Sequence, residues 1–415
     1  AGIAAEVELM PGTLLYLTDR WPHQPGESFV SNEIRDLAPH FDRLFVLPLA
    51  ENVDESLPLR DVPDGVEVLE NVRSAAWLRW KRSGLLRRFG MGVARPGVVL
   101  SNISKAPVRD MLGEVAQVRL LASSVEAALD PSSVDAVAAF WLNRGASVAA
   151  ELKRRHPHLV AFARGHGGDI YSKRRGMAHL PLQRETLRLL DGILPDSQAG
   201  VDHLCGKYPE NKTRIHVGRL GVDDQQQNAE HSTDGILRLL SVSGLVPVKR
   251  VHLIPEALEQ TTRDIIWTHI GDGECKVEVE AAAASVGDNV DVRLVGQKPH
   301  AEVLQHYCDE PVDLLINVSS SEGLPVSIME AFSFGVPAMV TAVGGSPEIV
   351  TESCGHLLPP DFEPTQLTHL LEKHDLEDQV LRAGALEMQH TQYSSKRNQA
   401  AFAAEIHAAM GRKQD

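Results

Sequence analysis

Short apolar runs alternate with amphipathic stretches through most of the chain. In the first half, runs with the length and composition of buried strands occupy 13–18, 43–49, 134–140, 158–163, 191–195 and 215–222. In the second half they occupy 237–243, 265–270, 290–295, 313–318 and 338–342. Helical patterns lie between them. Apolar strands that alternate with helices are typical of parallel sheets covered on both faces, so we predict an α/β fold.

The length and one polar stretch predict the domain organisation. The chain has 415 residues, which is too long for one typical core, so two domains are expected. The stretch 223–235 has the polar composition of an interdomain linker. We therefore predict an N-terminal domain at 1–222 and a C-terminal domain at 236–394. The last segment, 395–415, has small and apolar residues at helical spacing and is predicted to be a helix.

Composition narrows the class of protein. A formal net charge of −15 argues against general nucleic-acid binding. The four cysteines are far apart and show no CxxC spacing, which favours a reducing compartment. We find no run of about 18 apolar residues and no N-terminal signal pattern, so we expect a cytoplasmic protein. Residues 1–9 precede Met10 and could be a cloning remnant or a processed start.

One basic segment, between Arg73 and Met91, differs from the acidic remainder. Its six basic residues are interleaved with two tryptophans and other apolar residues. Lysine and arginine attract anionic headgroups and tryptophan suits the membrane interface, so one interpretation is peripheral contact with the inner face of the plasma membrane. An equally supported alternative is a helix whose apolar face packs on a sheet while its arginines are solvated.

The most informative stretch is 313–349. It reads as a strand, a serine-rich loop, a helix, a second strand and a double glycine, Gly344 and Gly345. Loops at the carboxyl ends of parallel strands meet at one edge of the sheet, where open α/β sheets bind ligands. Glu322 opens the helix and Glu330 lies about two turns along, so their carboxylates can reach different parts of one hydroxyl-rich ligand. Either glutamate alone is more simply explained as a helix-end or solvated residue.

Together these features resemble the retaining GT-B glycosyltransferases of family four, and in particular those that assemble bacterial capsule, exopolysaccharide and lipopolysaccharide. Their Glu-x7-Glu signature reads here SEG-x-P-x-SIMEA-x3-G-x-P, followed by GG-x-x-E-I-V. The resemblance implies two Rossmann-like doubly wound domains facing a central cleft, with 395–415 crossing back to the N-terminal domain. It also implies that Glu330 holds the ribose and Glu322 the sugar of a nucleotide diphosphosugar. The other implied donor-binding residues of this stretch are Gly323, Leu324, Pro325, Gly344 and Gly345.

Two blocks extend the resemblance into the first domain. Residues 164–171, RGHGGDIY, follow a predicted strand and resemble the R-x-HG-x-D-x-Y sequence of polysaccharide-assembling members. A lone histidine is more often structural. The resemblance implies that His166 lies where donor sugar and acceptor meet, and that Asp169 orients it or an acceptor hydroxyl. The loop ending at Gly26 is a plain turn by local chemistry, but it resembles a family loop that lies over the donor phosphates.

The loop after strand 237–243 departs from the family pattern. Lys249 and Arg250 precede a predicted helix, where they could bind a diphosphate or be ordinary surface cations. The family usually has G-R-L with a lysine five residues after the arginine. Here Gly244 replaces the arginine and Lys249 matches the lysine, and Arg250 could restore the missing charge.

The implied reaction is transfer of a sugar from a nucleotide diphosphosugar to a hydroxyl of a glycan, lipid-linked or small-molecule acceptor. The anomeric configuration would be retained, and neither a metal nor a cofactor is expected. Three alternatives stay open: a GT-B sugar nucleotide epimerase or phosphorylase, a non-catalytic sugar-binding protein, and a catalytically silent partner subunit.

Overall fold

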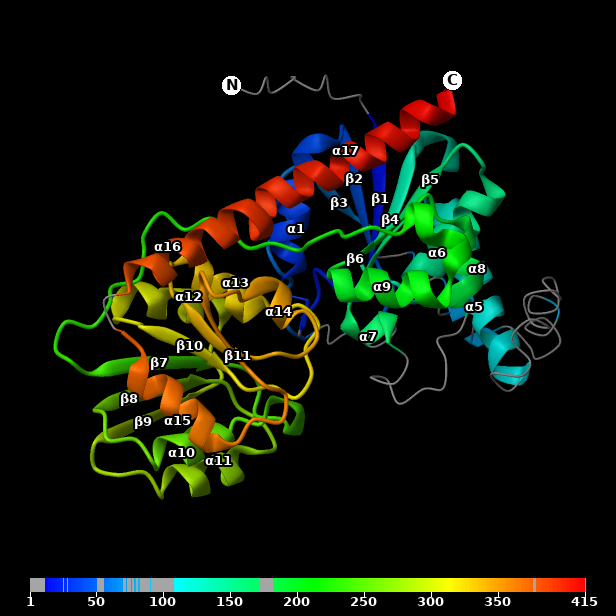
Figure 1. Ribbon diagram of the computed structural model, residues 1–415. Helices are drawn as coiled ribbons and strands as arrows, with labels where there is room; N and C mark the ends of the chain where they lie inside the picture. The colour runs from blue at the N-terminus through cyan, green and yellow to red at the C-terminus, as the bar shows by residue number, and fades with distance from the viewer. Residues whose placement is uncertain are drawn as a thin grey trace, which may run out of the picture. The chain divides into compact units, whose positions relative to one another are not determined.

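The computed structural model describes residues 12–414 except 25, 28, 51–55, 70, 71, 73–75, 77, 80, 83–89, 91–107, 172–181, 376 and 377. The chain divides into two compact units. Unit 1 comprises the residues up to Arg219 and those from Lys396 onward, and unit 2 comprises Leu220–Ser395. Each unit is built on one parallel sheet covered by helices (Figure 1), so the predicted α/β fold is confirmed.

The sheet of unit 1 has six described strands in the order β3-β2-β1-β4-β5-β6, all parallel. Their bounds are β1 Thr13–Thr18, β2 Arg43–Pro48, β3 Val66–Val68, β4 Ala136–Ala139, β5 Val160–Gly165 and β6 Gly192–Pro195. The chain reverses its direction of progress across the sheet between β1 and β4, which is the position where open α/β sheets bind ligands. The predicted strand at 215–222 is wrong, because only isolated bridges form there, at Ile215 and Val222.

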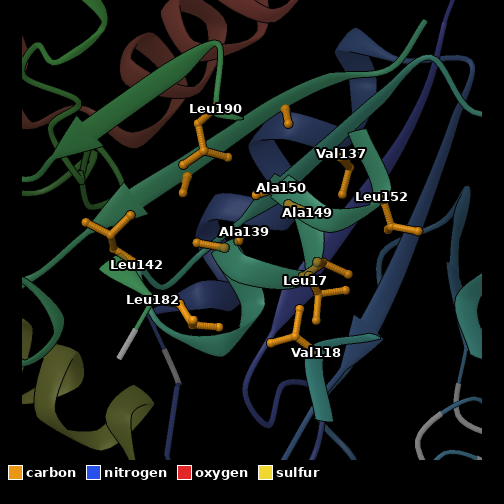
Figure 2. Packing of buried hydrophobic residues seen from close by; sticks show 14 of the residues in the cluster. Leu17, Val118, Val137, Ala139, Leu142, Ala149, Ala150, Leu152, Leu182 and Leu190 are labelled. Carbon is orange, nitrogen blue, oxygen red and sulfur yellow. The ribbon is translucent and has the colours of Figure 1, made fainter. Parts of the chain in front are cut away.

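Helices bury the apolar faces of this sheet. They are α1 Val30–Leu37, α5 Val108–Ala128, α6 Arg144–Arg155, α7 Gly167–Ile170, α8 Gln183–Leu189, α9 Gln198–Lys207 and α17 Ser395–Gln414. Figure 2 shows part of the core, in which Val118 of α5 and Ala149 of α6 lie among Leu17 and Val137 of the strands. The small residues of α6 allow its backbone to approach the sheet closely. The loop before α6 therefore lies at the carboxyl ends of the strands.

The sheet of unit 2 repeats the same plan, with six described parallel strands in the order β12-β11-β10-β7-β8-β9. Their bounds are β7 Leu237–Val242, β8 Ile265–Ile270, β9 Val290–Gly296, β10 Leu314–Asn317, β11 Ala338–Thr341 and β12 Gly355–Leu358. The first five correspond to predicted strands, and β12 was not predicted. Here the reversal lies between β7 and β10, and the loops after both strands carry the candidate donor-binding residues.

The helices of unit 2 are α10 Leu253–Leu258, α11 Lys276–Ala283, α12 His300–Asp309, α13 Val326–Ser333, α14 Ser346–Ile349, α15 Pro364–Lys373 and α16 Gln379–Met388. The polar stretch 223–235, predicted to be a linker, belongs to this unit. The N–H of Ala229 donates to the carbonyl of Phe334 at 2.9 Å, and the hydroxyl of Ser232 donates to Asp313 at 2.6 Å. The stretch is therefore bound along unit 2 by specific hydrogen bonds.

A buried arginine holds α17 on unit 1. Arg164 is 1% exposed, and its Nε lies 2.8 Å from Oε1 of Glu33, which also accepts the hydroxyl of Tyr16. Another guanidinium nitrogen donates to Gln399 at 2.9 Å, and the guanidinium lies 4.6 Å from the ring centre of Phe402. Glu33 thus neutralises an arginine that has almost no contact with water, while Gln399 and Phe402 bring α17 to it.

Most of the basic segment between Arg73 and Met91 lies outside the described residues. The described basic side chains of this segment, Arg79, Lys81 and Arg82, are exposed. The membrane contact therefore stays a prediction. Within the described part of the chain, no helix combines the length and the apolar character needed to span a bilayer.

Candidate functional site

A lysine and a glutamate from two loops of unit 2 form the centre of the candidate donor site. Lys249 ends a single 3-10 turn after β7, and Glu322 follows β10. Nζ of Lys249 lies 2.6 Å from Oε1 of Glu322, which also accepts the side-chain amide of Asn317 at 3.2 Å. Glu322 is only 8% exposed. A cation is therefore held at the carboxyl edge of the sheet, at the strand-order reversal.

Arg250, the second predicted phosphate ligand, has a different role in the structure. It adopts a left-handed backbone conformation, with φ of +47°. Its Nε donates to the carbonyl of Val318 at 2.9 Å, and a second nitrogen donates to the carbonyl of Ser319 at 3.2 Å. Burial lowers the pKa of its guanidinium. Arg250 thus supports the loop after β10, and Lys249 is the cation paired with a site carboxylate.

Glu330 lies on α13 and is paired with a histidine that sequence reasoning missed. Oε1 of Glu330 lies 2.6 Å from Nε2 of His300, the first residue of α12. Glu330 is 8% exposed, whereas the side chain of His300 is 45% exposed. His300 could have been found from the sequence, because it is a histidine that begins a helix shortly after the strand ending at Gly296.

The double glycine packs against the loop that contains Glu322. The N–H of Gly345 donates to the carbonyl of Gly323 at 2.7 Å. The N–H of Gly345 is therefore engaged within the protein and does not point to a ligand. Among the described residues, no acceptor is recorded for the N–H of Gly323 or Leu324, which precede α13. Pro325 is the N-cap of this eight-residue helix, so these two amides lie at its positive end.

In unit 1, His166 is stacked among aromatic rings at the carboxyl end of β5. Its ring centre lies 4.5 Å from that of Phe140, with 16° between the planes, and 4.7 Å from that of Trp141. Neither ring nitrogen has a hydrogen-bond partner among the described residues. Burial lowers the pKa of His166, but the carboxylates of Asp169 and Asp196 outweigh it, so the net shift is upward. Nδ1 of His166 lies 3.9 Å from Oδ2 of Asp169, and this carboxylate favours the imidazolium form.

Asp169 positions the loops around His166. It has no exposed surface. One carboxylate oxygen accepts the N–H of His166 at 2.5 Å, and the other accepts the N–H of Leu142, after β4, at 2.6 Å. Of the two predicted roles, orientation of His166 fits this burial, because a fully enclosed carboxylate cannot reach an acceptor hydroxyl.

The loop after β1 is organised by Glu27, which sequence reasoning did not single out. Gly26 and Glu27 both have positive φ, +95° and +54°. The carboxylate of Glu27 accepts the N–H groups of Arg20 and Trp21, each at 2.6 Å, and the indole N–H of Trp141 at 2.5 Å. Gly26 thus allows the chain to turn back, so that the Glu27 carboxylate contacts the backbone of its own loop.

No group of three or more His, Cys, Asp and Glu side chains gathers as metal ligands would among the residues that the structure describes. At the sheet reversal of unit 2, the loops after β7 and β10 instead hold the ion pair of Lys249 and Glu322.

Comparisons with known proteins bear on the family match of unit 2 and on the fold. Residues 223–390, which lie in unit 2, match the family described as Glycosyl transferases group 1. Solved structures similar to the whole chain include the lipopolysaccharide outer core galactosyltransferase WaaB, with a TM-score of 0.64 and 16% identity over 94% of this chain and 99% of that one. Another is Anabaena HepE in complex with UDP, with a TM-score of 0.64 and 16% identity over 95% of this chain and 100% of that one. The chain thus has the GT-B fold of glycosyltransferases.

Curated relatives include two glycosyltransferases named for exopolysaccharide biosynthesis. The amylovoran biosynthesis glycosyltransferase AmsK of Erwinia amylovora is 30% identical over 168 residues, which are 38% of this chain and 41% of that protein. The putative colanic acid biosynthesis glycosyltransferase WcaL of Salmonella typhimurium is 29% identical over 237 residues, which are 52% of this chain and 57% of that protein. The chain spans about half the length of the curated relatives it matches.

Proposed function

We propose that this chain is a glycosyltransferase that moves a sugar from a nucleotide diphosphosugar to a hydroxyl acceptor during assembly of a surface polysaccharide. The ion pair of Lys249 and Glu322, held at 2.6 Å beside the positive end of α13, is the observation that carries this proposal. The domain match and the relatives' names support the reaction class. The solved complexes of HepE with UDP and with UDP-glucose support a nucleotide-sugar as donor.

The barrier to such a transfer lies in charge that develops on the leaving diphosphate and on an oxocarbenium-like sugar. Lys249 and the amides of Gly323 and Leu324 would stabilise the diphosphate, because preorganised donors act strongly where negative charge develops. Diphosphate binding would also draw Lys249 away from Glu322. The Glu322 carboxylate would then accept hydroxyls of the donor sugar in place of the lysine ammonium.

In this scheme Glu330 holds the ribose hydroxyls and the sugar is transferred with retention, without a metal or cofactor. His166 contacts the reacting sugar and its acceptor, which is a glycan, a lipid-linked molecule or a small molecule. Its Nε2, which has no hydrogen-bond partner among the described residues, is suited to a hydroxyl group, and its raised pKa favours a donating imidazolium. Peripheral association with an anionic membrane through the basic segment belongs to the same proposal.

The test is a panel of nucleotide-sugars screened by thermal shift, followed by calorimetry and product analysis with the full chain. We expect one nucleoside diphosphosugar to bind and be turned over only with an acceptor, and NMR of the product to show a retained anomeric configuration. Lys249→Ala and Glu330→Ala should each weaken donor binding at least tenfold. His166→Ala should depress turnover far more than donor affinity.

Three results would contradict the proposal. Conversion of donor without any acceptor would indicate an epimerase. Sugar binding with no dependence on the nucleotide would indicate a sugar-binding protein. Unchanged donor affinity in both Lys249→Ala and Glu330→Ala would mean that the donor does not bind at the carboxyl ends of the strands of unit 2.

A further inference from the structure

The pairing of His300 with Glu330 leaves one carboxylate oxygen available. Nε2 of His300 lies 2.6 Å from Oε1 of Glu330. Among the described residues, no donor is recorded for Oε2, and the glutamate side chain keeps 11% of its surface exposed. An ionised carboxylate only accepts hydrogen bonds, so the histidine nitrogen that faces it must carry the proton. His300 therefore donates from Nε2 to Oε1 of Glu330.

A second contact, between α12 and the end of α13, packs these elements together. Tyr307 lies two turns after His300 on α12, and its ring stacks on Phe334, which caps α13, with 4.7 Å between centroids and 9° between planes. Tyr307 is 1% exposed and Phe334 is 1% exposed. The backbone positions of His300 and Glu330 are thus set by buried packing, and the hydrogen bond selects the rotamer of the glutamate.

An oriented carboxylate can distinguish a diol from a single hydroxyl. Each carboxylate oxygen has two acceptor positions, so Oε1 can accept His300 and one ribose hydroxyl while Oε2 accepts the other. Without His300 the carboxylate would rotate among several orientations, and the entropy of fixing it would weaken the paired contact. The effect should be largest for a ligand that offers both hydroxyls.

We propose that His300 is a positioning residue that sets the preference of the Glu330 site for ribonucleotides over 2′-deoxyribonucleotides. The inference rests on the proposed function, because it requires that the donor nucleotide bind at Glu330. It assigns to His300 no contact with the reacting atoms. The residue acts through the carboxylate that it holds.

The test compares a nucleoside diphosphate with its 2′-deoxy form by calorimetry on the full chain. UDP, GDP and ADP are screened first, and the tightest binder is used. We expect the wild type to prefer the ribonucleotide on the order of tenfold. His300→Ala should bring this ratio close to one, chiefly by weakening the ribonucleotide. His300→Gln should keep most of the preference, because an amide N–H can replace the imidazole donor, whereas a purely structural role would not depend on the donor.

His216 provides a matched control, because its Nε2 lies 2.6 Å from Glu405 in unit 1 and its side chain is also 45% exposed. His216→Ala should leave the ratio unchanged. The inference would be overturned if His300→Ala kept the wild-type ratio of ribonucleotide to 2′-deoxyribonucleotide affinity, or if the wild type showed no preference. In either case the proposed function would still stand if Glu330→Ala lost nucleotide binding. Failure of the wild type to bind any of the three diphosphates would overturn both.

Discussion

A β-carbon on Gly344 would lie 1.9 Å from the carbonyl oxygen of Glu322. Gly344 has φ of +57°, a conformation that side chains rarely adopt. The neighbouring Gly345 donates its N–H to Gly323 at 2.7 Å. The double glycine thus allows the loop after β11 to close onto the loop that contains Glu322, and it fixes the backbone on which the candidate donor site is built.

Gly344→Ala should destabilise unit 2 by about 1–3 kcal/mol, because both the backbone conformation and the close approach become unfavourable. Urea unfolding followed by tryptophan fluorescence measures this, since Trp267 is fully buried and is the one tryptophan between 220 and 395 in the sequence. Gly244→Ala is the control. The nearest atom to its β-carbon would be 3.7 Å away, so its stability should change little. Equal stability of the two variants would contradict this account of the double glycine.

Arg164→Met should destabilise unit 1 by about 3–5 kcal/mol, because Glu33 would be left buried without its cation. Urea unfolding of the full chain, with hydrogen exchange of α17, measures both the stability and the anchoring of that helix. Adding Glu33→Gln should recover part of the loss. As a comparison, Arg144→Met removes the more exposed pair with Glu114 and should cost about 1 kcal/mol or less. Similar losses in the two arginine variants would argue against a buried ion pair.

His166 should titrate above the ordinary value of 6.5, and Asp169→Asn should lower its pKa, because the carboxylate of Asp169 raises it against the effect of burial. Since the folded-state pKa is raised, protonation of His166 stabilises the fold below the unfolded pKa, and this stabilisation is lost as pH rises through the folded pKa. Asp169→Asn should therefore show a smaller fall in stability as pH rises from the unfolded-state pKa to the folded-state pKa of His166. NMR of ring-labelled histidine checks the titration, and His216, whose raised pKa comes from Glu405, serves as the internal reference. An unshifted His166 in Asp169→Asn would rule out this coupling.

Gly244→Arg should tighten binding of a nucleoside diphosphate several-fold, because it returns a cation to the position where the resembling family has arginine. Gly244 is exposed and has room for a side chain, with 3.7 Å to the nearest atom from a built β-carbon. Calorimetry against Gly244→Gln, a neutral side chain, isolates the effect of charge. An equal gain in affinity in Gly244→Arg and Gly244→Gln would mean that packing, not charge, causes the gain. No gain in either variant would mean that Lys249 already supplies the cation.

Much of the fold followed from local patterns. Strands β7 to β11 each lie at or close to a predicted apolar run, because strands buried on both faces need a continuous apolar sequence. The strands β3 and β12 were missed, although the similarly short edge strand β6 was predicted. The run at 215–222 is apolar without pairing as a strand, because burial of Ile215 and Val222 is achieved by other contacts.

The sequence by itself determined that two parallel sheets form, that Lys249, Glu322 and His166 stand in loops after strands, and that Glu330 lies on the helix after one of them. These properties depend on periodicity and on spacing within one segment. Only the tertiary structure decided what each side chain contacts. Arg250 donates to a carbonyl 68 residues further along the sequence. Glu330 and His300 are 30 residues apart in the sequence, and Glu27 and Trp141 are 114 residues apart. Such partners are brought together by the packing of whole elements, and no local pattern encodes them.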